Sequence, residues 1–179
     1  MKPLVNQERL VSTFIDLAKI ASPSWEEKGV IEYIKQKADT LGVECALYPC
    51  NNSYNVLIRI PGDKSYNPVL FSCHMDTVTP CENIQPIIKD NKIVSDGRTI
   101  LGADDKSAIA AFLEAISLLQ QHSLPHGHIE FLFSCAEEVG LFGAKGFDLS
   151  VVKAKYAFVF DSDGPVGKII VAAPYHISM

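Results

Sequence analysis

Three long apolar runs in this chain each end in side chains that can bind a metal ion. The runs are VLFSC at 69–73, IEFLFSC at 129–135 and YAFVF at 156–160. Their polar ends are His74 and Asp76, Glu137 and Glu138, and Asp161 and Asp163. Continuous apolar runs of this length are typical of strands buried on both faces of a sheet. We therefore expect a fold whose three buried strands carry chemistry at their carboxyl ends.

The segments between these runs predict three helices. Apolar residues recur at three- and four-residue spacing, which is typical of amphipathic helices, over 6–21, 30–41 and 104–121. Ser24 and Glu27 fit a capping box before the second helix, and Gly42 is placed to end it. The third helix begins at two aspartates, Asp104 and Asp105, whose charge suits the positive end of the helix dipole.

Two hairpins complete the pattern and define the fold class. The strand-like segments 43–49 and 54–60 flank the polar turn 51–53, and the segment 84–96 turns at 90–91. Strands that alternate with helices imply an α/β fold. We predict a three-layer α/β/α arrangement around a mixed, mostly parallel sheet, and a short helix or turn at 141–149.

Four separated segments then meet at one edge of this sheet. Ligands of open α/β sheets bind at the carboxyl ends of the strands, and the loop that carries Asp104 opens toward the same place. A single hard divalent ion rarely needs so many carboxylates. Two ions about 3.5–4 Å apart do, and such a pair requires one carboxylate that bridges both.

Composition excludes several other classes of protein. The chain has 179 residues and a formal net charge of −5, and it lacks the polybasic stretch that nucleic-acid phosphates require. Its apolar runs are far shorter than the roughly 20 residues of a membrane span. Glu8, Arg9 and Asp16 interrupt the first twenty residues, which argues against a signal peptide and favours a cytoplasmic protein. The five cysteines lack metal-site spacing.

Four motifs stand in the order and approximate spacing of a known family. They are HMDTVTP at 74–80, GADDKSAIAAFLEAI at 102–116, FLFSCAEEVGLFGAKGF at 131–147 and VFDSDGPVG at 159–167. On these motifs the chain resembles the co-catalytic zinc metallopeptidases that include peptidase T, succinyl-diaminopimelate desuccinylase and aminoacylase. It is most similar to the peptidase T-like members, over nearly its whole length.

The resemblance implies a role for each motif residue. His74 becomes a metal ligand, and Asp76 holds its imidazole, because a ligating histidine needs its other ring nitrogen anchored. Asp104 becomes the carboxylate that bridges two zinc ions. Adjacent strand residues point in different directions, which suits the family's division of labour between Glu137 as general base and Glu138 as metal ligand.

Asp161 matches the carboxylate that completes the first metal site. Its neighbour Asp163 precedes a glycine and is expected to form a turn. Asp105 and Lys106 are interpreted as capping and solvated charges outside the metal site.

By the same resemblance, the second metal site is short of a ligand. The first ion would have His74, Asp104 and Asp161, whereas the second would have Asp104 and Glu138 alone; catalytic zinc normally takes three protein ligands. The family supplies the missing ligand from a distant histidine beyond an inserted lid or dimerisation domain. We therefore expect a truncated member: 1–173 as the first part of the catalytic domain and 174–179 as the start of the lid.

No other histidine is expected to substitute. The histidines before the second apolar run, His122, His126 and His128, would lie at the opposite edge of the sheet, about 20 Å away by strand geometry. His176 lies near the end of the chain with no acid placed to orient it.

The expected function is that of a tripeptidase- or aminopeptidase-like enzyme, which hydrolyses short peptides with water activated by two metal ions. The substrate partner is a short peptide, and the absent lid could form a homodimer. Two alternatives stay open. The chain could be an N-acyl amino acid deacylase, or it could be a catalytically incompetent fragment that binds at most one metal.

Overall fold

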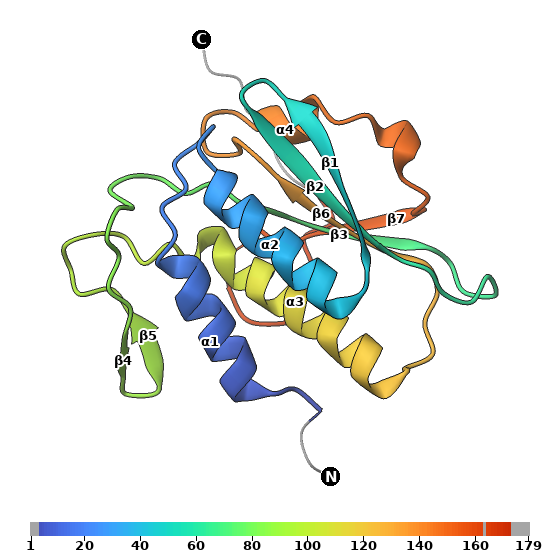
Figure 1. Ribbon diagram of the computed structural model, residues 1–179, viewed down its shortest axis with the longest axis horizontal. Coiled ribbons are helices and arrows are strands. Elements are labelled where there is room, and N and C mark those ends of the chain that lie inside the picture. The colour runs from blue at the N-terminus through green and yellow to red at the C-terminus, as the bar shows by residue number, and fades with distance from the viewer. Residues whose placement is uncertain (1–3, 163, 173–179) are drawn as a thin grey trace.

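The computed structural model describes residues 4–162 and 164–172, which form helices packed against a central sheet (Figure 1). The helices are α1 (Gln7–Ala18), α2 (Lys28–Leu41), α3 (Ala103–His122) and α4 (Phe142–Lys145), with a 3₁₀ turn at Leu149–Val151. The strands are β1 (Glu44–Cys50), β2 (Ser53–Ile60), β3 (Val69–His74), β4 (Ile87–Lys89), β5 (Lys92–Val94), β6 (Ile129–Ser134) and β7 (Tyr156–Val159). The three predicted helices and both hairpins are confirmed, and Gly42 ends α2 in the left-handed conformation.

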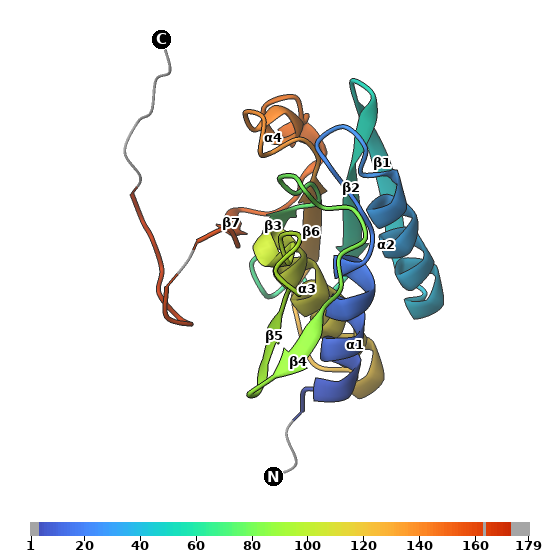
Figure 2. The ribbon, with the colours of Figure 1, turned by 90° about the vertical axis from the view of Figure 1, so that its left-hand side faces the viewer.

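The central sheet has five strands in the order β1-β2-β6-β3-β7. β1 pairs with β2 and β2 with β6 in antiparallel fashion, whereas β3 runs parallel to both β6 and β7. The prediction of a mixed sheet in an α/β fold is confirmed, and its parallel part consists of β6, β3 and β7. The β4–β5 hairpin forms a separate two-stranded sheet away from the others (Figures 1 and 2).

The two faces of the sheet are covered unequally. Helices α1, α2 and α3 lie side by side on one face, in front of the sheet in Figure 1. The main core lies between these helices and the strands, and its members include Leu17, Ile34, Ile109, Ile116, Ile58, Phe131 and Phe133. On the other face, Phe147 and the segment that follows it pack on Leu57, Leu70 and Leu132. The second layer is therefore thin over the described residues.

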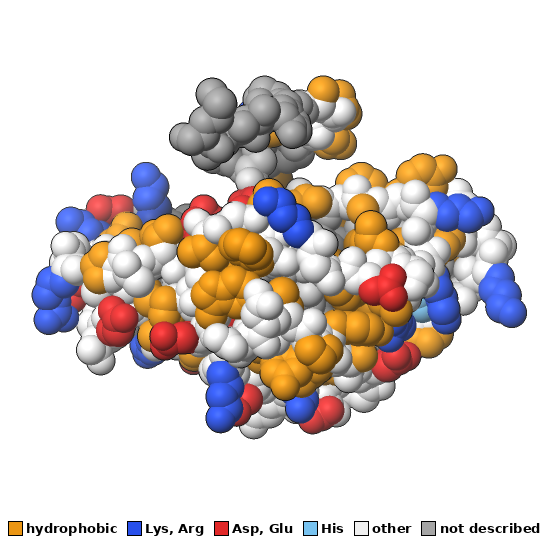
Figure 3. Space-filling view, turned by 90° about the horizontal axis from the view of Figure 1, so that it is seen from above, with side chains coloured by type: hydrophobic (Ala, Val, Ile, Leu, Met, Phe, Trp, Pro, Cys, Tyr) orange, Lys and Arg blue, Asp and Glu red, His pale blue; other side chains and the backbone are white. Residues whose placement is uncertain are grey.

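The third apolar run differs from the prediction. β7 is the last strand in the sheet order, and all four of its residues are exposed, with Phe158 44% and Val159 69% accessible. An apolar run becomes a buried strand only where other elements cover it, and no described helix lies over β7. On the face shown in Figure 3, hydrophobic side chains are exposed between the charged side chains.

The predicted capping box is also wrong. The N-cap residue of α2 is Glu27, and its side chain caps nothing in that helix. Ser24 and Glu27 instead contact residues far away in the chain: Ser24 donates to Asp76, and Glu27 accepts from Ala136 and Ser53. The local spacing is that of a capping box, but tertiary partners take both side chains.

The contact between α1 and α3 provides a first stability prediction. Buried Glu114 of α3 accepts hydrogen bonds from the Arg9 guanidinium at 2.6 and 2.9 Å and from the Asn6 backbone N–H at 2.9 Å. Replacing Glu114 with Ala should lower the free energy of unfolding at pH 7 by about 2 kcal/mol, because charged hydrogen bonds are lost from a buried site. Urea unfolding measures this, with exposed Glu32→Ala as the control.

The same pair predicts a dependence on pH. Although burial opposes it, hydrogen bonds from Arg9 and Asn6 hold the pKa of Glu114 below its ordinary value of 4.5. A lowered carboxylate pKa stabilises the fold above the unfolded value, and that contribution is lost as the pH falls through the folded value. The stability gap between wild type and Glu114→Ala should therefore narrow in acid. A gap that widens below pH 4 would contradict this account.

Candidate metal centre

The ends of three parallel strands bring the predicted site residues to one edge of the sheet. His74 ends β3 and lies in register with Ser134, the last residue of β6. After β6, the chain continues to Glu137 and Glu138. In β7, Val159 lies in register with Ser72, and Asp161 follows two residues later. Parallel strands share their carboxyl ends, so topology alone assembles these side chains.

The imidazole of His74 lies at the centre of the cluster. Its Nε2 is 3.0 Å from Oδ1 of Asp104 and 3.8 Å from Oδ1 of Asp161. Its Nδ1 is 2.9 Å from the backbone carbonyl oxygen of Asp76. The ring is buried, whereas the side chain of Asp104 is 74% exposed. One ring nitrogen is thus anchored by the protein, and the other faces carboxylates at an opening to solvent, which suits a metal ligand.

The carboxylate of Asp76 lies beside His74 and also accepts hydrogen bonds from the loop after β6. Its carboxylate is fully buried and lies 3.6 Å from Nδ1 of His74, while its oxygens accept the backbone N–H groups of Glu137 at 2.9 Å and Glu138 at 3.1 Å. The Ser24 hydroxyl donates a third hydrogen bond at 2.6 Å. Burial alone would raise the pKa of Asp76, but these hydrogen bonds lower it. Asp76 is therefore a fixed anion that joins the loop after β6 to β3.

The remaining acids crowd one another around His74. Burial raises the pKa of Glu137, Glu138 and Asp161, and neighbouring carboxylates raise it further, while His74 opposes the shift. Although burial of its ring opposes protonation, Asp76 and the two neighbouring aspartates raise the pKa of His74 to about 10. A cation bound among these acids would reduce the repulsion between their carboxylates and favour the ionised forms.

The described part of the chain contains two groups of donors that could hold a metal ion. One joins His74, Asp104 and Glu138, and the other joins His74, Asp105 and Asp161; within each, the donor atoms lie within 4.8 Å of one another. Imidazole and carboxylate oxygens suit zinc and other divalent ions. Among the described residues, the buried Oδ2 of Asp105 has no hydrogen-bond partner. The residues present therefore fit a metal centre.

The sequence suggested that Asp105 and Lys106 are solvated charges, but both side chains are buried. Asp105 is 5% exposed, and burial raises its pKa to about 8. Lys106 is fully buried, its Nζ donates to the carbonyl oxygen of Ile20 at 2.6 Å, and burial lowers its pKa to about 8. Both residues lie at the start of α3, where the helix packs into the core rather than projecting into solvent. The peptide bond between Asp104 and Asp105 is cis.

Other predicted residues lie away from the centre or outside the described residues. His128 precedes the first residue of β6, which pairs with Val69 at the end of the sheet opposite His74, so the prediction for this histidine is confirmed. Asp163, His176 and the boundary at 173–174 lie outside the described residues. Sequence reasoning missed Glu27 and Asn55, whose side chains hold the loop after β6. The spacing of Ser24 and Glu27 was a signal, but it predicted a local cap.

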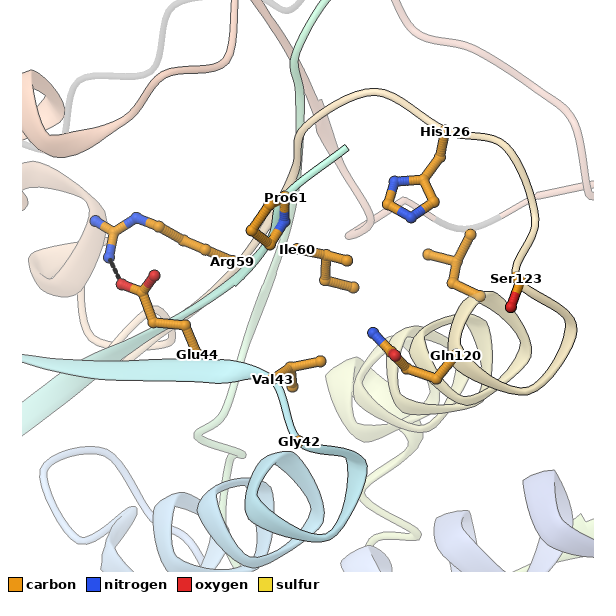
Figure 4. Close-up of a pocket in the computed structure, with 10 residues that line it drawn as sticks. Gly42, Val43, Glu44, Arg59, Ile60, Pro61, Gln120, Ser123 and His126 are labelled. Carbon is orange, nitrogen blue, oxygen red and sulfur yellow. Dashed lines mark hydrogen bonds and ion pairs between the residues drawn. The ribbon is translucent and has the colours of Figure 1, made fainter. Parts of the chain in front are cut away.

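A pocket of about 400 Å³ lies at the opposite edge of the sheet (Figure 4). It is bounded by Gly42 at the end of α2, Ser123 at the end of α3, and the ion pair between Glu44 and Arg59. His126 points toward it from the loop before β6. Neither of the donor groups found among the described residues lies in the walls of this pocket; both include His74.

Within residues 4–162 and 164–172, no helix has the length and apolar character needed to cross a membrane. All five cysteines are free thiols.

Known proteins match both the sequence and the fold. Residues 55–170 match the model of a family described as Peptidase family M28. An uncharacterised protein, YqjE of Bacillus subtilis, is 39% identical over 176 residues, which cover 96% of this chain and 47% of that protein. Aminopeptidase PepT from Bacillus cereus shares 41% identity at a TM-score of 0.91, over 94% of this chain and 47% of its own.

A tripeptidase from Staphylococcus aureus shares 33% identity at a TM-score of 0.88, over 92% of this chain and 46% of its own. The sequence resemblance to peptidase T-like zinc peptidases is thereby confirmed. The chain spans about half the length of each of these three relatives.

Proposed function

Because the chain belongs to peptidase family M28, we propose that it provides the metal-binding and catalytic residues of a peptidase that removes residues from short peptides. The observation that carries this proposal is the convergence of His74, Asp104, Glu138 and Asp161 beside Glu137 at one edge of the sheet. Family membership supports the reaction class. The geometry supports the residues.

We propose that the centre holds two divalent ions, with zinc as the expected metal. His74, Asp104 and Asp161 would hold the first, and Asp104 and Glu138 would hold the second. Bound ions would polarise the scissile carbonyl and make water a stronger nucleophile near neutral pH. The short distances from His74 to Asp104 and Asp161 support the first set. The second set has fewer ligands, so we expect the second ion to bind more weakly.

Glu137 is proposed as the general base. It belongs to neither donor group, its backbone N–H is fixed by Asp76, and its carboxylate is close enough for the charges of the cluster around His74 to shift its pKa. Burial and the neighbouring acids raise its pKa, which moves this carboxylate toward the range in which it can both accept and return a proton. In this role, Glu137 takes a proton from water and delivers it to the leaving amine.

The proposed substrate is a short peptide with a free amino terminus. The solved relatives above are an aminopeptidase and a tripeptidase, which supports this substrate class. Cleavage of an N-acyl amino acid is the same chemistry on another amide. The chain covers about half of each relative, so its activity on its own is part of the proposal.

Hydrolysis of three matched compounds tests the proposed function. The purified chain, loaded with zinc, should cleave trialanine, should cleave N-acetyl-trialanine far more slowly, and should lose activity with a chelator and regain it with zinc. Products are measured by mass spectrometry. Faster release of acetate from N-acetylalanine would favour the deacylase, and zinc binding without any hydrolysis would favour the incompetent fragment.

We also propose a cytoplasmic location. Five free thiols support it, because free cysteines persist in reducing compartments.

A further inference from the structure

The loop that carries the two glutamates is held by side chains along its backbone. Four consecutive N–H groups, those of residues 135–138, each donate to a side-chain oxygen from elsewhere in the chain. Asn55 accepts the first at 3.1 Å, Glu27 the second at 2.9 Å, and Asp76 the third and fourth. Side chains from three distant segments thus replace the strand ladder that ends at Ser134.

Glu27 is the member of this set that belongs to neither the metal centre nor the sheet. Its side chain is fully buried. Its Oε1 accepts the N–H groups of Trp25 and Ala136, both at 2.9 Å, and its Oε2 accepts the Ser53 hydroxyl at 2.5 Å. A buried carboxylate is costly unless it is fully hydrogen-bonded, so these bonds fix its position. Glu27 therefore joins the start of α2, the start of β2 and the loop after β6.

We propose that Glu27 is a positioning residue for the Glu137–Glu138 pair, an inference that rests on the proposed function. Its contact is with Ala136, which directly precedes Glu137 and has a positive φ of 48°. A backbone in this conformation needs to be held, because a side chain makes it unfavourable. By fixing Ala136, Glu27 determines the backbone position of the next two residues. These residues are Glu137, the proposed base, and Glu138, the proposed metal ligand.

A second buried glutamate provides a matched control. Glu130 is also fully buried, and it accepts the backbone N–H groups of Lys153 and Ala154. It lies near the beginning of β6, toward the edge opposite His74, and it pairs with Arg59. Replacing Glu130 with Ala should destabilise the chain without moving the glutamate pair. A change at the glutamate pair that appears in a Glu27 variant but not in Glu130→Ala therefore cannot be a general effect of losing a buried carboxylate.

The test separates the geometry of Glu27 from its charge. In Glu27→Gln, the remaining oxygen can still accept from Trp25 and Ala136, so the loop should stay in place. In Glu27→Asp, the charge remains but the carboxylate is withdrawn by one methylene. Hydrogen exchange of the metal-free chain should show amide protection at 136–138 falling about 10- to 100-fold in Glu27→Asp, and little change in Glu27→Gln or Glu130→Ala.

Zinc affinity gives the second measurement. Residues that orient a metal ligand typically contribute 10- to 100-fold to affinity, so Glu27→Asp should bind zinc about tenfold more weakly, and Glu27→Gln within about threefold of wild type. Equal losses in Glu27→Gln and Glu27→Asp, or unchanged protection at 136–138 in Glu27→Asp, would overturn the proposal. Absence of zinc binding in wild type would refute the proposed function instead, and the exchange data would still decide the role of Glu27.

Discussion

Replacing Glu137 with Gln is expected to lower kcat by about 10²- to 10⁴-fold, the range typical of losing a general base, while zinc still binds. The amide occupies the same space but cannot accept a proton from water. The backbone N–H of residue 137 still donates to Asp76, so the loop should keep its position. KM should change little, since the side chain belongs to neither donor group.

Steady-state kinetics on trialanine and zinc titration of the same samples measure both parts of this prediction. Glu44→Gln makes the same chemical change on β1, near the edge of the sheet opposite His74, and should leave kcat unchanged. A Glu137→Gln variant that retains full activity would remove Glu137 from the role of base. Loss of zinc along with activity would instead make it a ligand.

Replacing Asp104 with Asn should lower zinc affinity by about 100-fold and abolish hydrolysis, because an amide cannot supply the charge of a bridging carboxylate. The Asp104 side chain is 74% exposed, and its Oδ1 lies 3.0 Å from Nε2 of His74. Because the Asp104 carboxylate is exposed, loss of its pair with His74 should lower the free energy of unfolding by no more than about 1 kcal/mol. Metal binding and stability should therefore separate in this variant.

Asp90→Asn is the control for this prediction. Asp90 lies in the exposed turn of the β4–β5 hairpin, so its replacement removes the same charge at a site away from the donor groups. Zinc should bind this control as it binds wild type. Equal affinity in Asp104→Asn and Asp90→Asn would rule out Asp104 as a ligand.

The sequence predicted the convergence of the site because its signal is topological. His74, Glu137 and Asp161 each follow an apolar run, and parallel strands place the residues that follow them at one edge. The helices and hairpins also followed from local periodicity and turn residues, since these patterns act within a few residues.

Features that depend on distant partners could not be predicted in this way. Lys106 looks like a surface charge until α3 packs it beneath the carbonyl of Ile20. Glu27 looks like a helix cap until β6 brings Ala136 to it. β7 has the composition of a buried strand, but its exposure is decided by what lies over it. Each case turns on a contact between segments that are far apart in the chain.

The most direct test of the account is the number of zinc ions per chain, measured by elemental analysis after equilibration with zinc and removal of the excess. The chain is predicted to retain one tightly bound ion and to take up a second at higher zinc concentration, because the first set has three ligands and the second has two. His74→Ala should retain none. A wild-type chain that holds no zinc, or a His74→Ala variant that holds as much as wild type, would contradict the account.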